Sequence, residues 1–96
     1  MRRSSVRPVV VSVLIDLPPA HRYHQATLEA IRHASDQLAI ATEIRAVPTD
    51  SIPPLEQVMS RGSAVVVGPG SPYSDQDAVH SCIAAARENG VPLVGT

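Results

Sequence analysis

Two short runs of β-branched residues constrain the fold of this chain more than any other feature of its sequence. Val9–Ile15 is an almost continuous apolar run bounded by Pro8 and Asp16, and Ser63–Val67 is a second run of the same kind. Such runs are typical of strands that are buried on both faces of a parallel sheet. The sequence therefore predicts a sheet whose two faces are both covered by helices.

The segments between these runs supply the helices. From Ala20 to about Ala41 the apolar residues recur with helical period, and Ser74 and Asp75 can cap a second helix that ends at Asn89-Gly90. In the first helix the expected packed face comprises His24, Leu28, Ile31, Ser35 and Leu38, with Ala26, Ala30 and Ala34 beside it, and its surface comprises Arg22, Gln25, Glu29, Arg32 and Asp36. In the second helix the expected buried face comprises Ala78, Val79, Cys82, Ile83 and Ala86.

Two further strands complete the predicted order. Thr42–Val47 alternates polar and apolar residues, as a strand near the sheet edge does, and Val91–Val94 returns as a strand after the second helix. One helical turn is expected at Leu55–Met59. This order predicts an α/β fold of the flavodoxin-like kind, a parallel sheet with helices on both faces, truncated after the fourth strand.

Composition and charge exclude several classes of protein. The 96 residues contain two Tyr, no Phe and no Trp, and the formal net charge is −1, so neither base stacking nor a basic field favours nucleic-acid binding. No apolar run reaches transmembrane length, and we expect no membrane partner. A single cysteine excludes an internal disulfide and makes a reducing cytoplasm the default location. Residues 1–7, with Arg2, Arg3 and Arg7, are expected to be a disordered basic leader before a domain at 8–96.

Gly68–Tyr73 is the strongest local signal for a site. It follows a buried strand and precedes a helix, and the N–H groups of Gly70, Ser71 and Tyr73 could hold an anion or a developing oxyanion. The alternative is a tight strand-to-helix turn that binds nothing. The segment lacks the third glycine of a dinucleotide fingerprint and the lysine of a P-loop, and no cofactor is expected.

The remaining candidates favour ordinary structural roles. The helical spacing of Cys82 predicts a buried thiol that packs in the core and does not react as a nucleophile. His21 and His24 are interpreted as solvated histidines at a helix start, because no third metal ligand is placed near them. Asp16 follows the first strand, where it could either contact a ligand or form a turn.

Several segments together resemble a known family. They are Val9–Ile15 with Asp16-Leu-Pro, Ala20-His-Arg, Ala30-Ile-Arg-His, Glu43-Ile-Arg, Val47-Pro-Thr-Asp50, Val66-Val-Gly-Pro-Gly-Ser-Pro-Tyr73 and Ala85-Ala-Arg-Glu-Asn-Gly-Val-Pro-Leu-Val-Gly-Thr96. They resemble the first half of the class I glutamine amidotransferase domain at the C-terminus of CTP synthase, and are closest to its stand-alone relatives, in which Gly-Ser-Pro-Tyr replaces Gly-Gly-Phe. The likeness covers the whole chain except the leader.

The resemblance implies a glutaminase that supplies ammonia in pyrimidine nucleotide biosynthesis, a ligase family. In that family the fourth strand leads into Gly-Xaa-Cys-Xaa-Gly, whose cysteine attacks the glutamine amide and is activated by a distant His-Xaa-Glu pair. Gly95 and Thr96 match the start of this elbow, and Gly70 and Ser71 match the oxyanion loop, with Gly68 and Tyr73 at its ends. The chain carries no catalytic residue at the nucleophile position, so we expect it to be inactive alone.

Three explanations for the end of the sequence at Thr96 stay open. The next codon could be UGA read as selenocysteine, because this group is known to include selenoproteins; the gene model or the expressed segment could be cut; or the chain could be a remnant. A different class of function is also open, a non-catalytic flavodoxin-like module that binds an anion or a protein at residues 68–73. The uncovered last strand is expected to cause self-association through the sheet edge.

Overall fold

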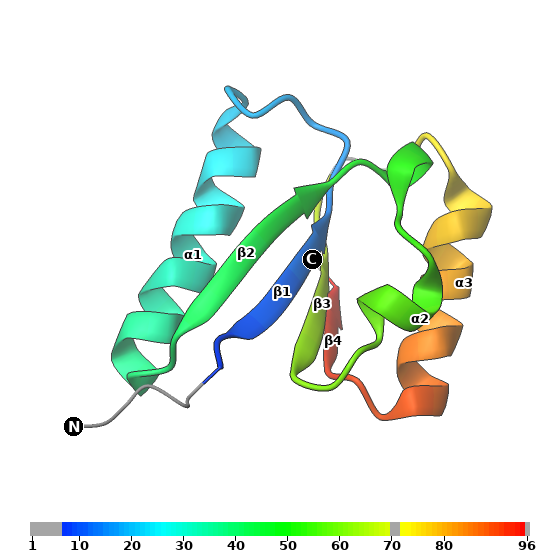
Figure 1. Cartoon of the computed structure of the whole chain (residues 1–96). Coiled ribbons are helices and arrows are strands. Elements are labelled where there is room, and N and C mark those ends of the chain that lie inside the picture. The colour runs from blue at the N-terminus through cyan, green and yellow to red at the C-terminus, as the bar shows by residue number, and fades with distance from the viewer. Residues whose placement is uncertain (1–6, 70–71, 96) are drawn as a thin grey trace.

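A computed structural model describes residues 7–69 and 72–95 of the chain, and its centre is a four-stranded parallel sheet. The strands are β1 (Val9–Leu14), β2 (Thr42–Val47), β3 (Ser63–Val67) and β4 (Leu93–Gly95), and their order across the sheet is β2-β1-β3-β4 (Figure 1). Every pair of neighbouring strands is parallel. The predicted α/β fold is confirmed, and the sheet is consistent with a flavodoxin-like architecture.

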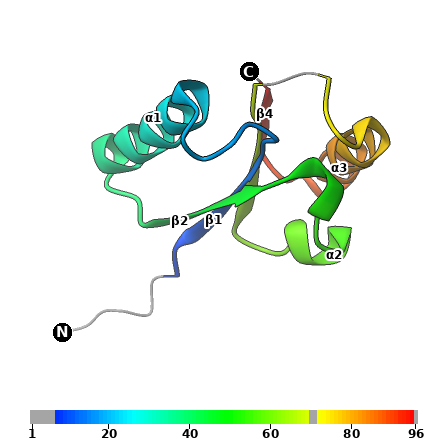
Figure 2. The same ribbon diagram turned by 90° about the horizontal axis from the view of Figure 1, so that it is seen from above.

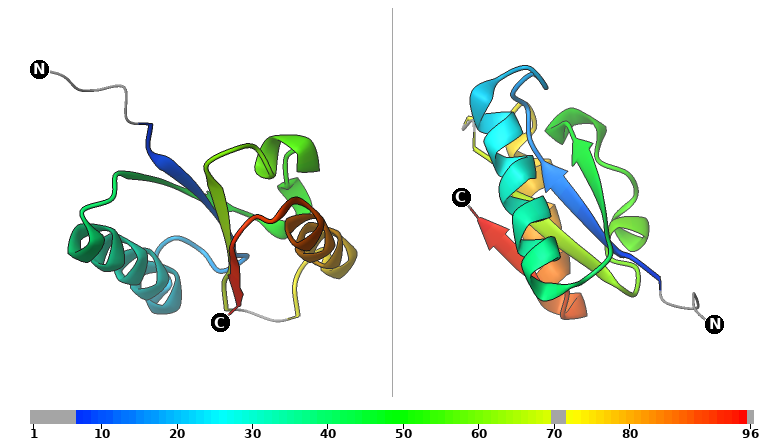
Figure 3. Two further views of the ribbon diagram at one scale, coloured as in Figure 1. Left: turned by 90° about the horizontal axis from the view of Figure 1, so that it is seen from below. Right: turned by 90° about the vertical axis from the view of Figure 1, so that its left-hand side faces the viewer.

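Helices lie on both faces of this sheet. Helix α1 (Arg22–Leu38) lies on one side, whereas α2 (Leu55–Val58) and α3 (Gln76–Asn89) lie on the other (Figure 2). A view from the side of α1 shows this helix crossing in front of the strands (Figure 3). A short 3₁₀ turn, η1 (Thr49–Ser51), follows β2. None of the described helices is both long enough and apolar enough to cross a membrane.

The alternation of side chains along β1 divides the core into two layers. Val11, Val13 and Ile15 belong to the layer under α1, whereas Leu14 belongs to the layer under α2 and α3. In the second layer Leu14 packs with the central residues of β3 and with Val79 and Cys82 of α3. The first strand is therefore buried on both faces, as its composition predicts.

The face of α1 is less covered than its periodicity predicts. His24 is buried, but Leu38 is 68% exposed, and Ala26, Ala30 and Ala34 are exposed as well. The expected packed face is therefore wrong at the end of the helix. The physical reason is that the α1 side of β3 and β4 has no helix over it among the described residues.

This uncovered side of the sheet is apolar. Val94 is 61% exposed, and two hollows of about 250 and 460 Å³ run between α1 and the strands β3 and β4. Their linings include Ile31, Val66 and Val94. An exposed apolar surface of this kind favours association. The self-association expected at this edge stays a prediction.

The ends of α3 follow the sequence signals. The Asp75 carboxylate accepts a hydrogen bond from the N–H of Ala78 at 2.9 Å, and Gly90 takes a left-handed conformation with φ of 66°. The Val91 N–H donates to the Ala86 carbonyl at 2.9 Å, and Pro92 has no N–H to offer. The fourth strand therefore begins at Leu93, two residues later than expected, and it continues to Gly95.

The backbone conformation at the C-terminal end of α1 is less favourable than the one at the end of α3. Ala39 ends the helix in a left-handed conformation with φ of 54° and ψ of 40°, so the helix stops before the expected Ala41. A residue other than glycine is strained in this conformation, because its Cβ approaches the following carbonyl oxygen.

We expect Ala39→Gly to raise the free energy of unfolding by about 0.5–1 kcal/mol, because glycine takes the left-handed conformation without this strain. Urea unfolding followed by far-ultraviolet circular dichroism measures the effect. The matched control is Ala84→Gly at an exposed interior position of α3, which should lower stability by about 1 kcal/mol. A loss of stability in both variants would contradict the prediction.

Candidate functional site

The candidate site lies where β1, β2 and β3 end, at the carboxyl edge of the sheet. The loop after β3 carries the strongest sequence signal, and its first residue, Gly68, is buried. The Gly68 N–H donates to the Leu14 carbonyl at 2.8 Å. A Cβ on Gly68 would lie 3.1 Å from that oxygen and 3.2 Å from the Ile15 side chain. Close approach of β1 is therefore sufficient to explain why glycine stands here.

Tyr73 closes the other end of this loop. Its hydroxyl donates to the Gly68 carbonyl at 2.7 Å, and its ring packs against the core layer under α3. This hydroxyl is used within the loop itself. Gly70 and Ser71, the two positions that resemble an oxyanion loop, lie outside the described residues, as do residues 1–6 of the expected leader and Thr96.

The Asp16 carboxylate ties three segments of the edge together. Its Oδ1 accepts from the Thr49 N–H at 2.8 Å, and its Oδ2 accepts from the Thr49 hydroxyl and the Ser74 N–H, each at 2.8 Å. Thr49 and Ser74 are 33 and 58 residues away in the sequence. Neither of the two roles expected for Asp16, a ligand contact or a turn, includes these bonds, in which the carboxylate joins distant loops.

Thr49 is the residue that the sequence interpretation missed. Its side chain is 1% exposed, and its Oγ1 both donates to Asp16 and accepts from the Asp75 N–H at 3.0 Å. The signal that could have found it is its place two residues after β2, at the same edge where Asp16 follows β1. Parallel strands bring both residues to one place.

The pKa of Asp16 reflects these contacts. Partial burial raises the pKa of the carboxyl, but the hydrogen bonds from Ser74 and Thr49 outweigh it and hold the pKa below its usual value of 3.8. Donors that bind the charged form favour ionisation. Asp16 is therefore an ionised acceptor within the protein, and its carboxylate occupies N–H groups that an external anion would otherwise contact.

Cys82 behaves as predicted. It is fully buried in α3, and burial raises the pKa of its thiol. A buried thiol in an apolar setting is a poor nucleophile. The sequence holds no other cysteine.

The two histidines of α1 differ in their surroundings. The His21 Nδ1 accepts a hydrogen bond from the Tyr23 N–H at 3.1 Å and caps the helix. His24 is 5% exposed and its Nδ1 lies 2.9 Å from the Leu17 carbonyl, so its interpretation as a solvated residue is wrong. Within residues 7–69 and 72–95, no three His, Cys, Asp or Glu side chains lie close enough together to hold a metal ion.

The end of β4 lies beside the loop after β3. In the parallel register Gly95 pairs with Val67, the residue directly before Gly68. The described part of β4 therefore ends beside Gly68, the first residue of the loop after β3.

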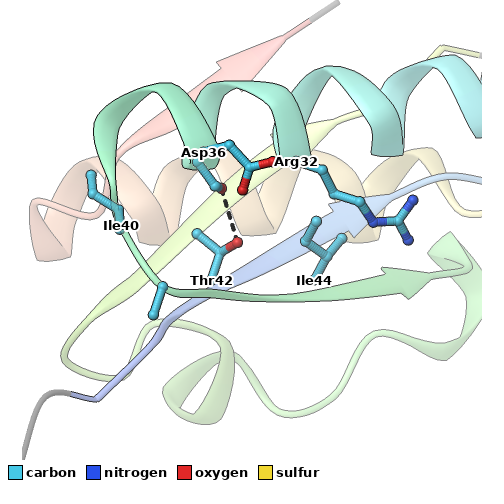
Figure 4. Close-up of a pocket in the computed structure, with 7 residues that line it drawn as sticks. Arg32, Asp36, Ile40, Thr42 and Ile44 are labelled. Carbon is cyan, nitrogen blue, oxygen red and sulfur yellow. Dashed lines mark hydrogen bonds between the residues drawn. The ribbon is translucent and has the colours of Figure 1, made fainter. Parts of the chain in front are cut away.

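A further hollow lies at the opposite end of the sheet. It measures about 450 Å³, and residues of α1 and β2 line it (Figure 4). Arg32 and Asp36 lie on its α1 side, and Ser35 Oγ is 2.9 Å from Thr42 Oγ1 across it (Figure 4). Because this hollow lies at the amino end of the strands, it is remote from the Gly68 loop and belongs to no site predicted here.

No protein-family model matches the chain, and no solved structure matches it.

Proposed function

We propose that this chain forms the oxyanion-loop half of a class I glutamine amidotransferase domain of the CTP synthase type, acting in the cytoplasm. Completed by a nucleophile and a His/Glu pair, such a domain releases ammonia from glutamine for pyrimidine nucleotide synthesis. The 96 residues by themselves do not carry that reaction, because their one cysteine is buried in α3.

The pairing of Val67 with Gly95 carries the proposal. It brings the start of the elbow-like sequence and the glycine-containing loop to adjacent positions at the carboxyl edge. In open α/β sheets ligands bind at this edge. The strand order β2-β1-β3-β4 supports the proposal further. The edge strands β2 and β4 are both parallel to their neighbours, so all four strands end at the same edge of the sheet.

A non-catalytic module is the second candidate. The observation that favours it is that Tyr73, Asp16, Thr49 and Ser74 are all engaged with one another or with the backbone of the loops. A set of completed internal hydrogen bonds suits a rigid binding surface. Of the two ligands expected for such a module at residues 68–73, an anion or a protein, this surface favours a protein, because Asp16 already accepts from the N–H groups of Thr49 and Ser74.

The coding sequence after the Thr96 codon separates the two candidates. The enzyme proposal expects UGA or a cysteine codon there, followed in frame by glycine codons and, downstream, His-Xaa-Glu. A frame without these residues would contradict it and leave the binding module.

Glutaminase measurements test the same proposal in the protein. We expect no ammonia release above background from the purified 96-residue chain, because a buried neutral thiol does not attack an amide. The polypeptide extended through the His-Xaa-Glu should release ammonia from glutamine, and replacing its nucleophile by alanine should lower the rate by about 10⁴-fold or more. Activity in the 96-residue chain would overturn this account.

A further inference from the structure

A buried hydroxyl in the middle of β1 has no partner in the described part of the chain. Ser12 is 7% exposed, and it lies between Val10 and Leu14 on the face that α2 and α3 cover. No hydrogen bond joins its side chain to the residues at 7–69 and 72–95. An unsatisfied buried hydroxyl costs about 1–3 kcal/mol, so a partner outside the chain is the physical expectation.

Ser12 lines a small cavity between β1, β2 and α2. The cavity measures about 140 Å³, and its polar lining also includes Arg45, Gln57, Ser60 and Ser63. The hydroxyls of Ser60 and Ser63 lie 3.1 Å apart, so one of their protons is used between them and the other is free to donate. The cavity is too large for one water molecule, which takes about 30 Å³ in the liquid.

Arg45 is the one charged side chain among the residues that line this cavity. Its Nε and Nη2 both lie 2.6 Å from Oε2 of Glu43. A guanidinium has a second edge, formed by Nη1 and Nη2, with the geometry to bind a carboxylate through two hydrogen bonds. No contact with the described residues occupies that edge.

The rest of the wall is apolar. Val10, Val47 and Val58 line the same cavity, so an occupant meets hydrocarbon as well as hydroxyl and amide groups. Glu43 already offsets the charge of Arg45, and this disfavours anions that carry two charges. The size and the lining together fit a molecule of about four to six heavy atoms.

We propose that this cavity binds a small monocarboxylate. The carboxylate lies on the open edge of Arg45, a hydroxyl or keto oxygen on the adjacent carbon bonds to Ser12 or Gln57, and the rest of the short carbon chain lies against the valines. The site faces α2 and lies away from the Gly68 loop. It is therefore independent of the amidotransferase proposal.

The experiment is a titration of the ¹⁵N-labelled 96-residue chain with sodium lactate, followed by the amide NMR spectrum. Sodium chloride and sodium phosphate at equal ionic strength are the reference titrations. We expect saturable shifts at Ser12, Gln57 and Ser63 with lactate, with a dissociation constant in the millimolar range. Absence of saturable shifts in the wild-type protein, or equal shifts with phosphate, overturns the proposal.

Two variants assign the contacts. Ser12→Ala should weaken lactate binding by about fivefold, the equivalent of one ordinary hydrogen bond. Arg45→Gln should weaken it by at least about tenfold. Arg32→Gln, on the opposite face of the sheet, is the matched control and should leave binding unchanged. Unchanged binding in Arg45→Gln also overturns the proposal, and the wild-type titration decides the question if that variant does not fold.

Discussion

Replacing Gly68 by valine is expected to lower the free energy of unfolding by at least about 3 kcal/mol. The first added carbon would already lie 3.1 Å from the Leu14 carbonyl oxygen and 3.2 Å from two atoms of the Ile15 side chain. The oxygen belongs to the backbone of β1, which is held in register by β2 and β3, so it cannot move aside without breaking the ladder. Gly68→Ala should show the same effect at a smaller size, about 1–3 kcal/mol.

Urea unfolding followed by far-ultraviolet circular dichroism measures both variants. The matched control is Gly95→Ala at the end of β4, where an added Cβ meets nothing within 4 Å. Its stability should stay within about 0.5 kcal/mol of the wild-type value. If Gly68→Val lost less than about 1 kcal/mol, the contact with β1 would not be the reason for glycine at this position.

The fold was predictable because the two core strands leave little choice. A run such as Val9–Ile15 must be covered on both faces, and the helical segments between the strands supply the cover. The prediction failed for the end of α1, where Leu38 has a helical position but no surface to contact. Periodicity describes a face of a helix, whereas burial depends on what the rest of the chain places opposite that face.

The candidate site was predictable only in its location. Glycines after a buried strand indicate that the chain leaves the sheet at the carboxyl edge, and in the structure β3 ends at Val67, directly before Gly68. The Asp16–Thr49–Ser74 contacts join loops that are far apart in the sequence, so no local pattern reveals them. Likewise, the one sequence signal for the burial of His24 is its helical register. Leu38 has the same register and is exposed, so this signal does not identify the buried residue.

Replacing Asp16 by alanine is expected to lower the free energy of unfolding by about 2–4 kcal/mol at neutral pH. The change removes three hydrogen bonds to a carboxylate and leaves the Thr49 hydroxyl, which is almost fully buried, without its acceptor. The matched control is Asp50→Ala. Among the described residues its exposed carboxylate bonds only to the neighbouring Ser51 hydroxyl, at 3.0 Å, and its loss should cost at most about 0.5 kcal/mol. Equal losses in the two variants would contradict a structural role for Asp16.

The pH dependence of this effect has a definite sign. Because the folded protein holds the pKa of Asp16 below its usual value of 3.8, the charged carboxylate favours the folded state. This contribution is complete above the unfolded pKa and is lost as the pH falls through the lower, folded pKa. The difference in stability between the wild type and Asp16→Asn should therefore be constant from neutral pH to about pH 5 and should shrink below about pH 4. Urea unfolding at a series of pH values measures this difference. A difference that grew on acidification would mean that Asp16 is neutral in the folded protein, and its hydrogen bonds to Thr49 and Ser74 would then need another explanation.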